Sequence, residues 1–247
     1  SRCETDSVSV LNNLYNNNQA QYGKSFANKY HEDSFDMRGS VFDFYYCFGV
    51  GSEVSSAWVN VESEATVNYE GSAGNACGIN SPEVYIDSNI ESECNDDSCG
   101  SQNNPFKTIT TALEWIIPSE LNPITLYLAE GTYSPETGEV FPLILIDYVN
   151  IQGQGEELTI LDAQQTDKVI IIDNNINNSI SDFTIQNGLL LGEESYNNEN
   201  NSGSGIYISF SSPIIKNVTI IDNDARYGGG IYMYRSNPIL TNVIFNG

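Results

Sequence analysis

Two segments near the carboxy terminus share one pattern of apolar and polar positions. Residues 205–218 align without a gap on residues 230–243, which begin 25 residues further along the chain. Each segment has two short runs of largely β-branched and aromatic residues, separated by Ser-Pro or Asn-Pro and followed by asparagine or glycine. Such runs predict short β-strands, and a period of this length predicts a solenoid. Weaker copies upstream, such as residues 180–185, extend the predicted solenoid to residues 124–247, or about five coils.

The first 80 residues lack this repeat. Apolar and polar residues alternate from Ala57 to Tyr69, which predicts one long strand, and the apolar run over residues 41–48 predicts another. We therefore expect a small β-rich domain over residues 1–80. The alternative for the long strand is pairing outside its own domain, along the sheet edge of a neighbouring molecule.

One amphipathic helix is predicted over residues 105–117. Asn104 and Pro105 are typical of a helix cap and first turn, and Pro118 ends the pattern. The apolar residues at helical spacing are Phe106, Ile109, Leu113 and Ile116. We expect this helix to cover the first coil of the solenoid, whose backbone groups would otherwise lack partners.

The other end of the predicted solenoid lacks a cover of this kind. The sequence reaches Gly247 in the middle of a coil, with neither a polar terminal repeat nor a helix after Phe245. Either the chain belongs to a longer solenoid, or this end docks on another molecule. Contacts with a neighbouring copy that do not close into a ring would build a filament. The residues expected to carry such self-association are Ile231, Met233, Ile239, Leu240, Val243 and Phe245.

Several segments carry a family resemblance: residues 228–232 and 237–243 in the repeats, and residues 84–87, 104–109 and 127–133 before them. Through these segments the chain from about residue 82 onward resembles the right-handed parallel β-helix of the pectate-lyase-like superfamily. It is most similar there to bacterial surface β-helix proteins and polymorphic outer-membrane protein repeats. The resemblance implies an all-β protein, with a right-handed parallel β-helix over residues 81–247, a capping helix at its start and the small disulfide-bearing domain before it. The superfamily includes lyases, hydrolases, adhesins and spacers, so the resemblance implies no particular activity.

Charge excludes two classes of partner. The 247 residues include 33 acidic and 9 basic side chains, a formal net charge of −24. Nucleic acids and anionic headgroups both attract basic surfaces, so we expect no nucleic-acid binding. No apolar run reaches the length of about 18 residues that spans a bilayer, so we expect no membrane insertion. The chain begins at Ser1 without a charged and apolar leader, as expected for a secreted protein whose signal peptide has been removed.

All five cysteines precede residue 100, and the repetitive part has none. This clustering predicts disulfides and an oxidising compartment. Cys94 and Cys99 are close enough to form a local loop, and Cys47 with Cys77 is the second predicted pair. Cys3 is then left over or bonds to another chain. Zinc is the alternative, but the sequence has no CxxC pair and a single histidine.

One acidic loop has the oxygen ligands that calcium prefers. Asp87, Asn89, Asp96 and Asp97 are the candidate ligands, although the loop lacks the spacing and central glycine of an EF-hand. The alternative is a solvated acidic loop without a metal ion. Calcium is the only cofactor that the sequence suggests.

The candidate catalytic residues are few. Polysaccharide lyases of this fold need basic residues around an acidic substrate, and Lys216 and Arg235 do not repeat from coil to coil. Glycoside hydrolases use paired carboxylates, for which Asp222 and Asp224 are the candidates. The alternative for both residues is a turn position, where aspartate is favoured for backbone reasons.

Other repeated polar and aromatic residues have structural and binding interpretations. Asn217 and Asn242 are expected at tight bends that need left-handed backbone geometry, with amides that hydrogen-bond along the solenoid axis. Tyr207, Tyr232 and Tyr234, with Phe210 nearby, either form an aromatic stripe that binds glycans or simply cover the sheet. Three N-glycosylation sequons occur, at Asn177, Asn200 and Asn217.

Together these features predict a secreted, non-enzymatic surface or extracellular protein with a structural or adhesive role. We expect it to self-associate head to tail into a filament, through the uncapped solenoid end and the amino-terminal segment. Its expected partners are other copies of itself and surface glycans. The alternative is a carbohydrate-active protein, either a glycoside hydrolase or a glycan-binding module.

Overall fold

Every pair of strands in the described part of the chain is parallel. The computed structural model describes residues 79–94, 98–116, 118–190 and 201–247, and six short strands in the first 78 residues without their side chains. Contacts divide the chain into two compact units, residues 1–80 with 114–117 and residues 81–113 with 118–247. Each unit is described by itself below.

The described residues of the first unit include three pairs of short strands. They are β1 (Leu14–Tyr15) with β4 (Val41–Phe42), β2 (Phe26–Asn28) with β5 (Val59–Val61), and β3 (Phe35–Asp36) with β6 (Val67–Asn68). The apolar run over residues 41–48 therefore contributes β4, and the alternating segment contributes β5 and β6. Among the described strands, β5 pairs with β2 and β6 with β3, all within this unit.

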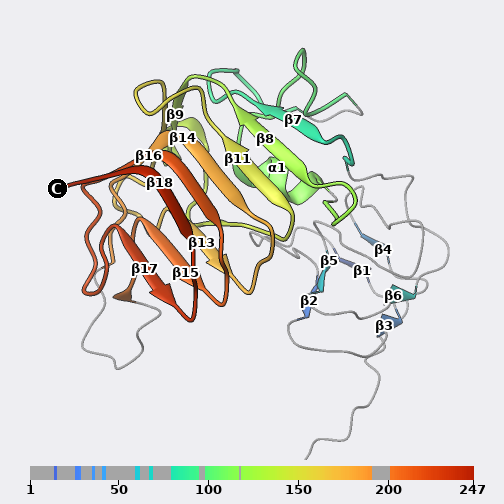
Figure 1. The fold of residues 1–247 in the computed structure, drawn as a ribbon. Coiled ribbons are helices and arrows are strands. Elements are labelled where there is room, and N and C mark those ends of the chain that lie inside the picture. Colours follow the sequence, from blue (N-terminus) through green and yellow to red (C-terminus); the bar gives the residue numbers. More distant parts are fainter. Residues whose placement is uncertain are drawn as a thin grey trace, which may run out of the picture. The chain divides into compact units, whose positions relative to one another are not determined.

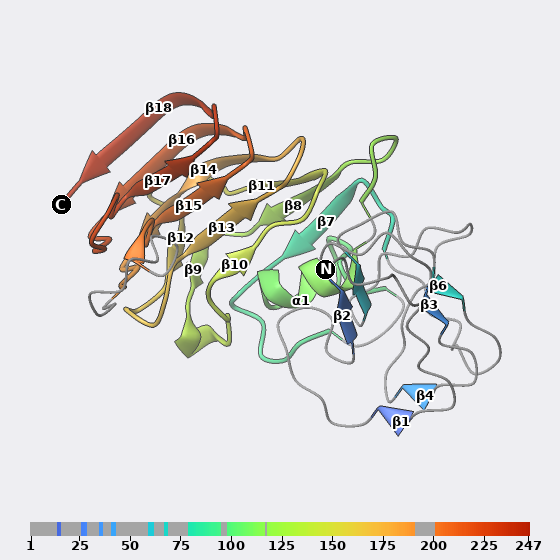
Figure 2. The ribbon, with the colours of Figure 1, turned by 90° about the horizontal axis from the view of Figure 1, so that it is seen from below.

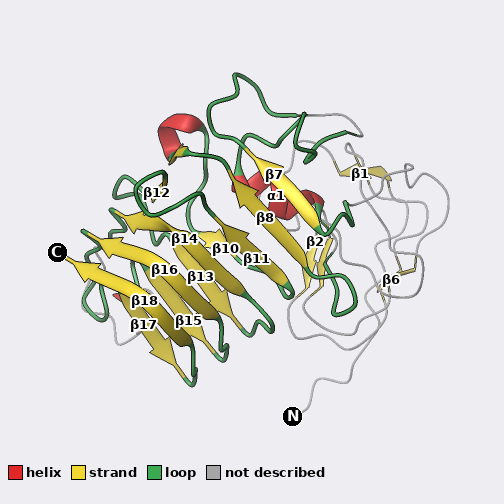
Figure 3. Ribbon diagram, turned by 45° about the horizontal axis from the view of Figure 1, so that its top comes forward, coloured by secondary structure: helices red, strands yellow, loops and turns green. Residues whose placement is uncertain are grey.

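The second unit holds one 3-10 helix, twelve strands and all but the last two residues of one α-helix among its described residues (Figure 3). In chain order they are β7 (Glu83–Ile86), α1 (Ile109–Trp115), β8 (Ile124–Leu128), β9 (Gly131–Tyr133), η1 (Pro135–Thr137), β10 (Leu143–Ile144), β11 (Val149–Gln152), β12 (Thr159–Asp162), β13 (Ile170–Asp173), β14 (Ser179–Gln186), β15 (Ile206–Ser209), β16 (Ile214–Ile221), β17 (Ile231–Tyr234) and β18 (Ile239–Asn246).

The strands form two sheets that the chain visits in turn. One sheet has the order β7-β8-β11-β14-β16-β18, with β9 and β12 alongside, and the other has the order β10-β13-β15-β17. Successive coils lie side by side from β7 to β18 (Figures 1 and 2). Residue Ile206 pairs with Ile231 and Ile214 with Ile239, so the sequence period of 25 residues is one coil. This arrangement fits a parallel β-helix-like fold.

The core consists of apolar columns that run from coil to coil. Ile180 pairs with Ile215, Phe183 with Val218, and all four side chains are fully buried. Because side chains alternate between the two faces of a strand, a slip of one residue would turn every core side chain outward. The repeated apolar positions therefore fix the register between neighbouring coils.

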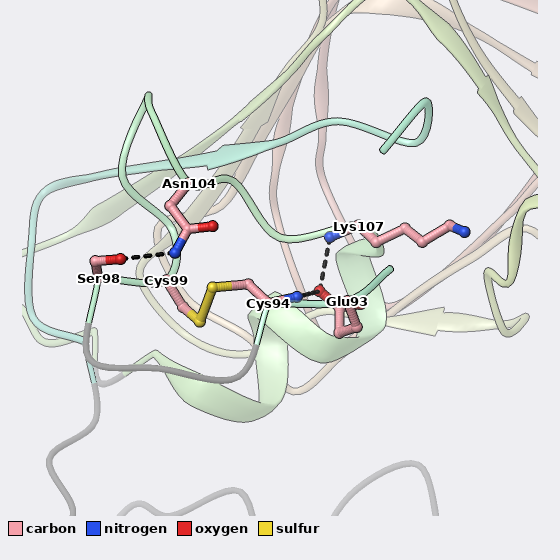
Figure 4. The surroundings of a disulfide bond; sticks show 6 residues. All are labelled: Glu93, Cys94, Ser98, Cys99, Asn104 and Lys107. Carbon is pink, nitrogen blue, oxygen red and sulfur yellow. Dashed lines mark hydrogen bonds between the residues drawn. A yellow bond between two sulfur atoms is a disulfide. The ribbon is translucent and has the colours of Figure 1, made fainter. Parts of the chain in front are cut away.

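The outer edge of the first coil is covered by the chain segment around the disulfide. Gly100 accepts a hydrogen bond from the backbone of Tyr85 in β7, and Phe106 donates to the Tyr85 carbonyl at 3.0 Å. The predicted Cys94–Cys99 disulfide is present (Figure 4). A carboxylate oxygen of Glu93 accepts the Lys107 N–H at 2.7 Å and the Cys94 N–H at 3.2 Å, which ties the disulfide loop to the segment before α1. This loop protects the β7 edge.

Helix α1 is shorter than the sequence predicts and begins later. Asn104 and Phe106 are extended and take part in β-bridges, so Asn104 is not the helix cap. The hydroxyl of Thr108 accepts the Thr111 N–H at 3.2 Å and takes the capping role instead. The prediction that Asn104 caps the helix was therefore wrong. Phe106 pairs with Ile86 on the β7 edge, and this pairing keeps the segment before α1 extended.

Candidate functional site

The last described coil, formed by β17 and β18, exposes side chains that are buried one coil earlier. Leu240 and Phe245 are 41% and 56% exposed, whereas their partners Ile215 and Ile220 on β16 are buried. The same change occurs from Ile208 on β15 to Met233 on β17. We call this surface the end rung and define it by Ile231, Met233, Leu240, Val243 and Phe245, all of which continue buried columns.

The six residues predicted for self-association do not all lie on this surface. Ile231 and Val243 are half-buried on the end rung, and Met233, Leu240 and Phe245 are exposed on it. Ile239 is also exposed, but it pairs with Ile214, which is itself exposed on the outer face of the sheet. Ile239 therefore lies on the outside of the coil and not on the end rung.

Strand β18 lacks two features that often protect a sheet edge, charged residues and proline. Proteins block edge strands with charged residues, prolines, bulges or a covering segment. The eight residues of β18 contain no charge and no proline, and among the described strands β18 pairs with β16 alone. Residues 230–247 carry a single charged side chain, Arg235, although the protein as a whole has a net charge of −24. The end rung can accept another strand without burying a charge.

A polar ladder runs along the axis beside the buried columns. Asp182, Asn217 and Asn242 occupy the same bend in three successive coils, with φ of 64°, 52° and 51°. The Asn242 amide donates to the Asn217 carbonyl oxygen at 3.1 Å, and the Asn217 amide donates to the Asp182 carboxylate at 2.7 Å. Aspartate and asparagine tolerate this left-handed geometry better than other side chains that carry a Cβ. The ladder aligns each coil on the next.

The aromatic residues predicted as a stripe lie in two groups. Tyr207 and Tyr232 stack with ring centroids 5.7 Å apart, and Tyr207 is only 6% exposed. Phe210 and Tyr234 meet edge to face at 5.5 Å, and both are exposed. The guanidinium of Arg235 lies 5.5 Å from the Phe210 ring and 5.3 Å from the Tyr234 ring. The second group is therefore the more exposed of the two.

Asp222 and Asp224 lie at an exposed turn after β16. Asp222 has a φ of 53°, and its N–H donates to the Asn246 carbonyl at 3.3 Å. The N–H of Asp224 donates to the Gly188 carbonyl at 2.8 Å. These contacts are those of turn residues that join one coil to the next.

The candidate calcium ligands are only partly described. Asp87 accepts hydrogen bonds at 2.9 Å from both the backbone and the side-chain amide of Asn89, so the two residues close a local turn. The Asn89 amide also donates to the Glu130 carbonyl at 2.9 Å. Asp96 and Asp97 lie outside the described residues, as do Cys3, Cys47 and Cys77. No group of three or more metal-ligating side chains occurs in the described ranges, and calcium stays a prediction.

The comparisons with known proteins give one match. The family described as "Protein of unknown function (DUF1565)" matches residues 92–246. The chain belongs to the DUF1565 family. No curated protein and no solved structure matches the chain. The DUF1565 region includes α1 and every strand from β8 to β18, and with them the end rung.

The sequence does not indicate that Glu139, within the DUF1565 region, is buried against the start of α1. Glu139 is 3% exposed, and its carboxylate accepts the N–H groups of Ile109 and Thr110 at 2.7 and 3.0 Å, as well as the Thr110 hydroxyl at 2.6 Å. Burial raises the pKa of Glu139, and these hydrogen bonds oppose the rise. The residue lies about one coil beyond the helix that it caps, so no local spacing reveals the contact.

The described helices include none that is long and apolar enough to cross a membrane.

Proposed function

We propose that this DUF1565 protein is a secreted, non-enzymatic surface or extracellular structural protein that self-associates head to tail into a filament. Its second unit is then a right-handed parallel β-helix of the pectate-lyase-like type, with α1 as its capping helix. The end rung receives the amino-terminal segment of the next copy. The observation that carries the proposal is the uncharged edge of β18, with exposed apolar side chains that continue the buried columns.

Apolar burial and new backbone hydrogen bonds would supply the free energy for covering the end rung. Full burial of an aliphatic or aromatic side chain contributes about 1.5–3 kcal/mol, and Met233, Leu240 and Phe245 are all more than two-fifths exposed. The backbone groups on the open side of β18 would gain strand partners at the same time. These gains have to exceed the loss of translational and rotational freedom, which costs several kcal/mol or more.

The arrangement of edges favours a head-to-tail contact through the amino-terminal segment. The β7 edge is already occupied by Gly100 and Phe106, so it is not available as a second strand-pairing surface. Residues 1–80 contain the alternating segment from Ala57 to Tyr69, and its strands β5 and β6 each pair with a single described strand, which leaves each a second edge for an intermolecular contact. Two different surfaces on one chain make a heterologous contact, which extends into a fibre unless it closes into a ring.

The disulfide supports placement outside the reducing cytosol. Disulfides persist mainly in secreted and extracellular proteins. Cys94–Cys99 closes a loop with a sequence separation of only five residues. A loop of this size stabilises the folded state by about 2 kcal/mol in the chain-entropy model.

The two neighbouring residues Val243 and Ile244 provide a test of assembly. We expect the wild-type protein to form filaments, Val243→Lys to remain monomeric, and Ile244→Lys to assemble like the wild type. Lysine at position 243 would be buried under the incoming strand, whereas position 244 pairs with Thr219 on the outer face and remains in solvent. Size-exclusion chromatography with light scattering measures the mass, and electron microscopy shows the filaments.

Circular dichroism and thermal unfolding check that both variants fold. Monodisperse wild-type monomers at high concentration, with and without Ca²⁺, would overturn the proposal. Equal assembly of the two lysine variants would place the contact somewhere other than the end rung.

A glycan-binding module is the second candidate, supported by the exposed pair Phe210 and Tyr234 beside Arg235. Aromatic faces stack on sugar rings, and a guanidinium donates hydrogen bonds to their oxygens. Phe210 has a φ of 46°, so Phe210→Asn removes the ring and keeps a residue that tolerates this geometry. If the module binds glycans, retention on a polysaccharide panel is lost in Phe210→Asn and kept in Tyr227→Asn, an exposed tyrosine elsewhere.

A further inference from the structure

The structure separates the three N-glycosylation sequons, which the sequence alone leaves equivalent. They begin at Asn177, Asn200 and Asn217. Asn200 lies outside the described residues, so the comparison is between Asn177 and Asn217. A folded protein can carry a glycan only on a side-chain amide that points into solvent and is not needed for packing between coils.

Asn217 does not meet this requirement. Its amide nitrogen donates to Asp182 at 2.7 Å, and its oxygen accepts from Asn242 at 3.1 Å. Both partners belong to neighbouring coils, which are spaced by about 4.8 Å in a parallel sheet. A sugar on this nitrogen has no space between the coils, and its attachment would break the ladder.

Asn177 has the opposite surroundings. It is exposed at the turn between β13 and β14, with a φ of 54°, and its side chain makes no hydrogen bond within the described ranges. The neighbouring Asn178 is buried and holds the turn in place, because its amide donates to the carbonyls of Ile146 and Val149 at 2.7 and 2.9 Å. The turn thus stays fixed whether or not Asn177 carries a substituent.

We propose that Asn177 is an N-glycosylation site of this protein. The amide nitrogen of Asn177 forms a bond to C1 of an oligosaccharide that a membrane enzyme transfers from a lipid-linked diphosphate donor. The bond from C1 to the diphosphate breaks, the lipid diphosphate leaves, and one amide proton is lost to a base of the transferase. This inference rests on the proposed secretion and is independent of self-association.

The position of Asn177 is compatible with assembly. Strand β13 pairs with β15, and β15 pairs with β17, so the turn after β13 lies two coils away from the end rung. A hydrophilic glycan there covers a side of the solenoid and leaves the end rung open. Glycosylation and filament formation are therefore expected in the same molecule.

The test uses the full chain, secreted behind a cleavable leader from a eukaryotic cell line. Intact mass spectrometry before and after peptide N-glycosidase measures the glycan. Three variants each remove one sequon: Asn177→Asp, Ser202→Ala and Thr219→Val. Aspartate tolerates the positive φ, and the fully buried Ser202 hydroxyl has no hydrogen-bond partner among the described residues, so neither change is expected to disturb the fold.

We expect the wild type to carry a glycan that is lost in Asn177→Asp and retained in Thr219→Val. Peptide mapping of the wild type gives a second readout, because glycosidase release converts the modified asparagine to aspartate at residue 177. An unmodified wild type, or full glycan mass in Asn177→Asp, would overturn the inference. Loss of a glycan in Thr219→Val would also overturn it, since Asn217 would then be the acceptor. None of these outcomes depends on whether filaments form.

Discussion

Phe183→Ala is expected to lower the free energy of unfolding by about 4 kcal/mol, in line with buried phenylalanines elsewhere. The Phe183 side chain is fully buried in β14, between the coils of β11 and β16. Its removal loses apolar burial and leaves a cavity that two neighbouring coils cannot both fill. Chemical denaturation, followed by circular dichroism at low protein concentration, measures the change.

The matched control is Phe245→Ala, which makes the same chemical change in the last coil. Phe245 is 56% exposed, so we expect a loss of no more than about 1.5 kcal/mol in the monomer. At concentrations where filaments form, the cost of Phe245→Ala should rise, because the side chain is then covered. Equal losses for the two variants in dilute monomer would contradict the core described here.

Glu139→Ala is expected to cost about 4 kcal/mol, because each buried donor left without an acceptor costs about 1–3 kcal/mol. The donors left without an acceptor are the N–H groups of Ile109 and Thr110, because the Thr110 hydroxyl also donates to the Val140 carbonyl at 3.1 Å. Glu136→Ala removes an equal charge from an exposed position nearby and should change stability by less than about 0.5 kcal/mol. Thermal and urea unfolding at mildly acidic pH compare the two variants. Equal small effects would show that α1 does not depend on this carboxylate.

The pH dependence of the same residue follows from its raised pKa. Folding raises the pKa of Glu139 above its ordinary value of 4.5, chiefly through burial. The folded state then holds the proton more tightly, so this contribution to stability is complete below pH 4.5 and is lost as pH rises through the folded pKa. Glu139→Gln cannot ionise, so its stability relative to the wild type should increase as pH rises above 4.5. The opposite slope would mean that the hydrogen bonds outweigh burial.

The end rung could be predicted only in part. The repeat alone places Leu240, Val243 and Phe245 in the same columns as core residues, because positions 25 residues apart pair between coils. It does not show that Ile239 lies on the outer face, since an apolar residue at a strand start fits either side. The sequence also shows that residues 230–247 carry a single charge. This matters for association because β18 lies at the edge of its sheet, where another strand could pair with it.

The sequence by itself determined the coil length, the strands of the two repeats, the left-handed bends at Asn217 and Asn242, and the Cys94–Cys99 pair. Each of these depends on residues close in sequence or one period apart, so a local pattern records it. Only the tertiary structure decided where α1 begins, what caps it, and which sequon asparagine is free. Those outcomes depend on Glu139, the β7 edge and the neighbouring coils, and contacts between residues about 30 positions apart follow no period that a single sequence displays.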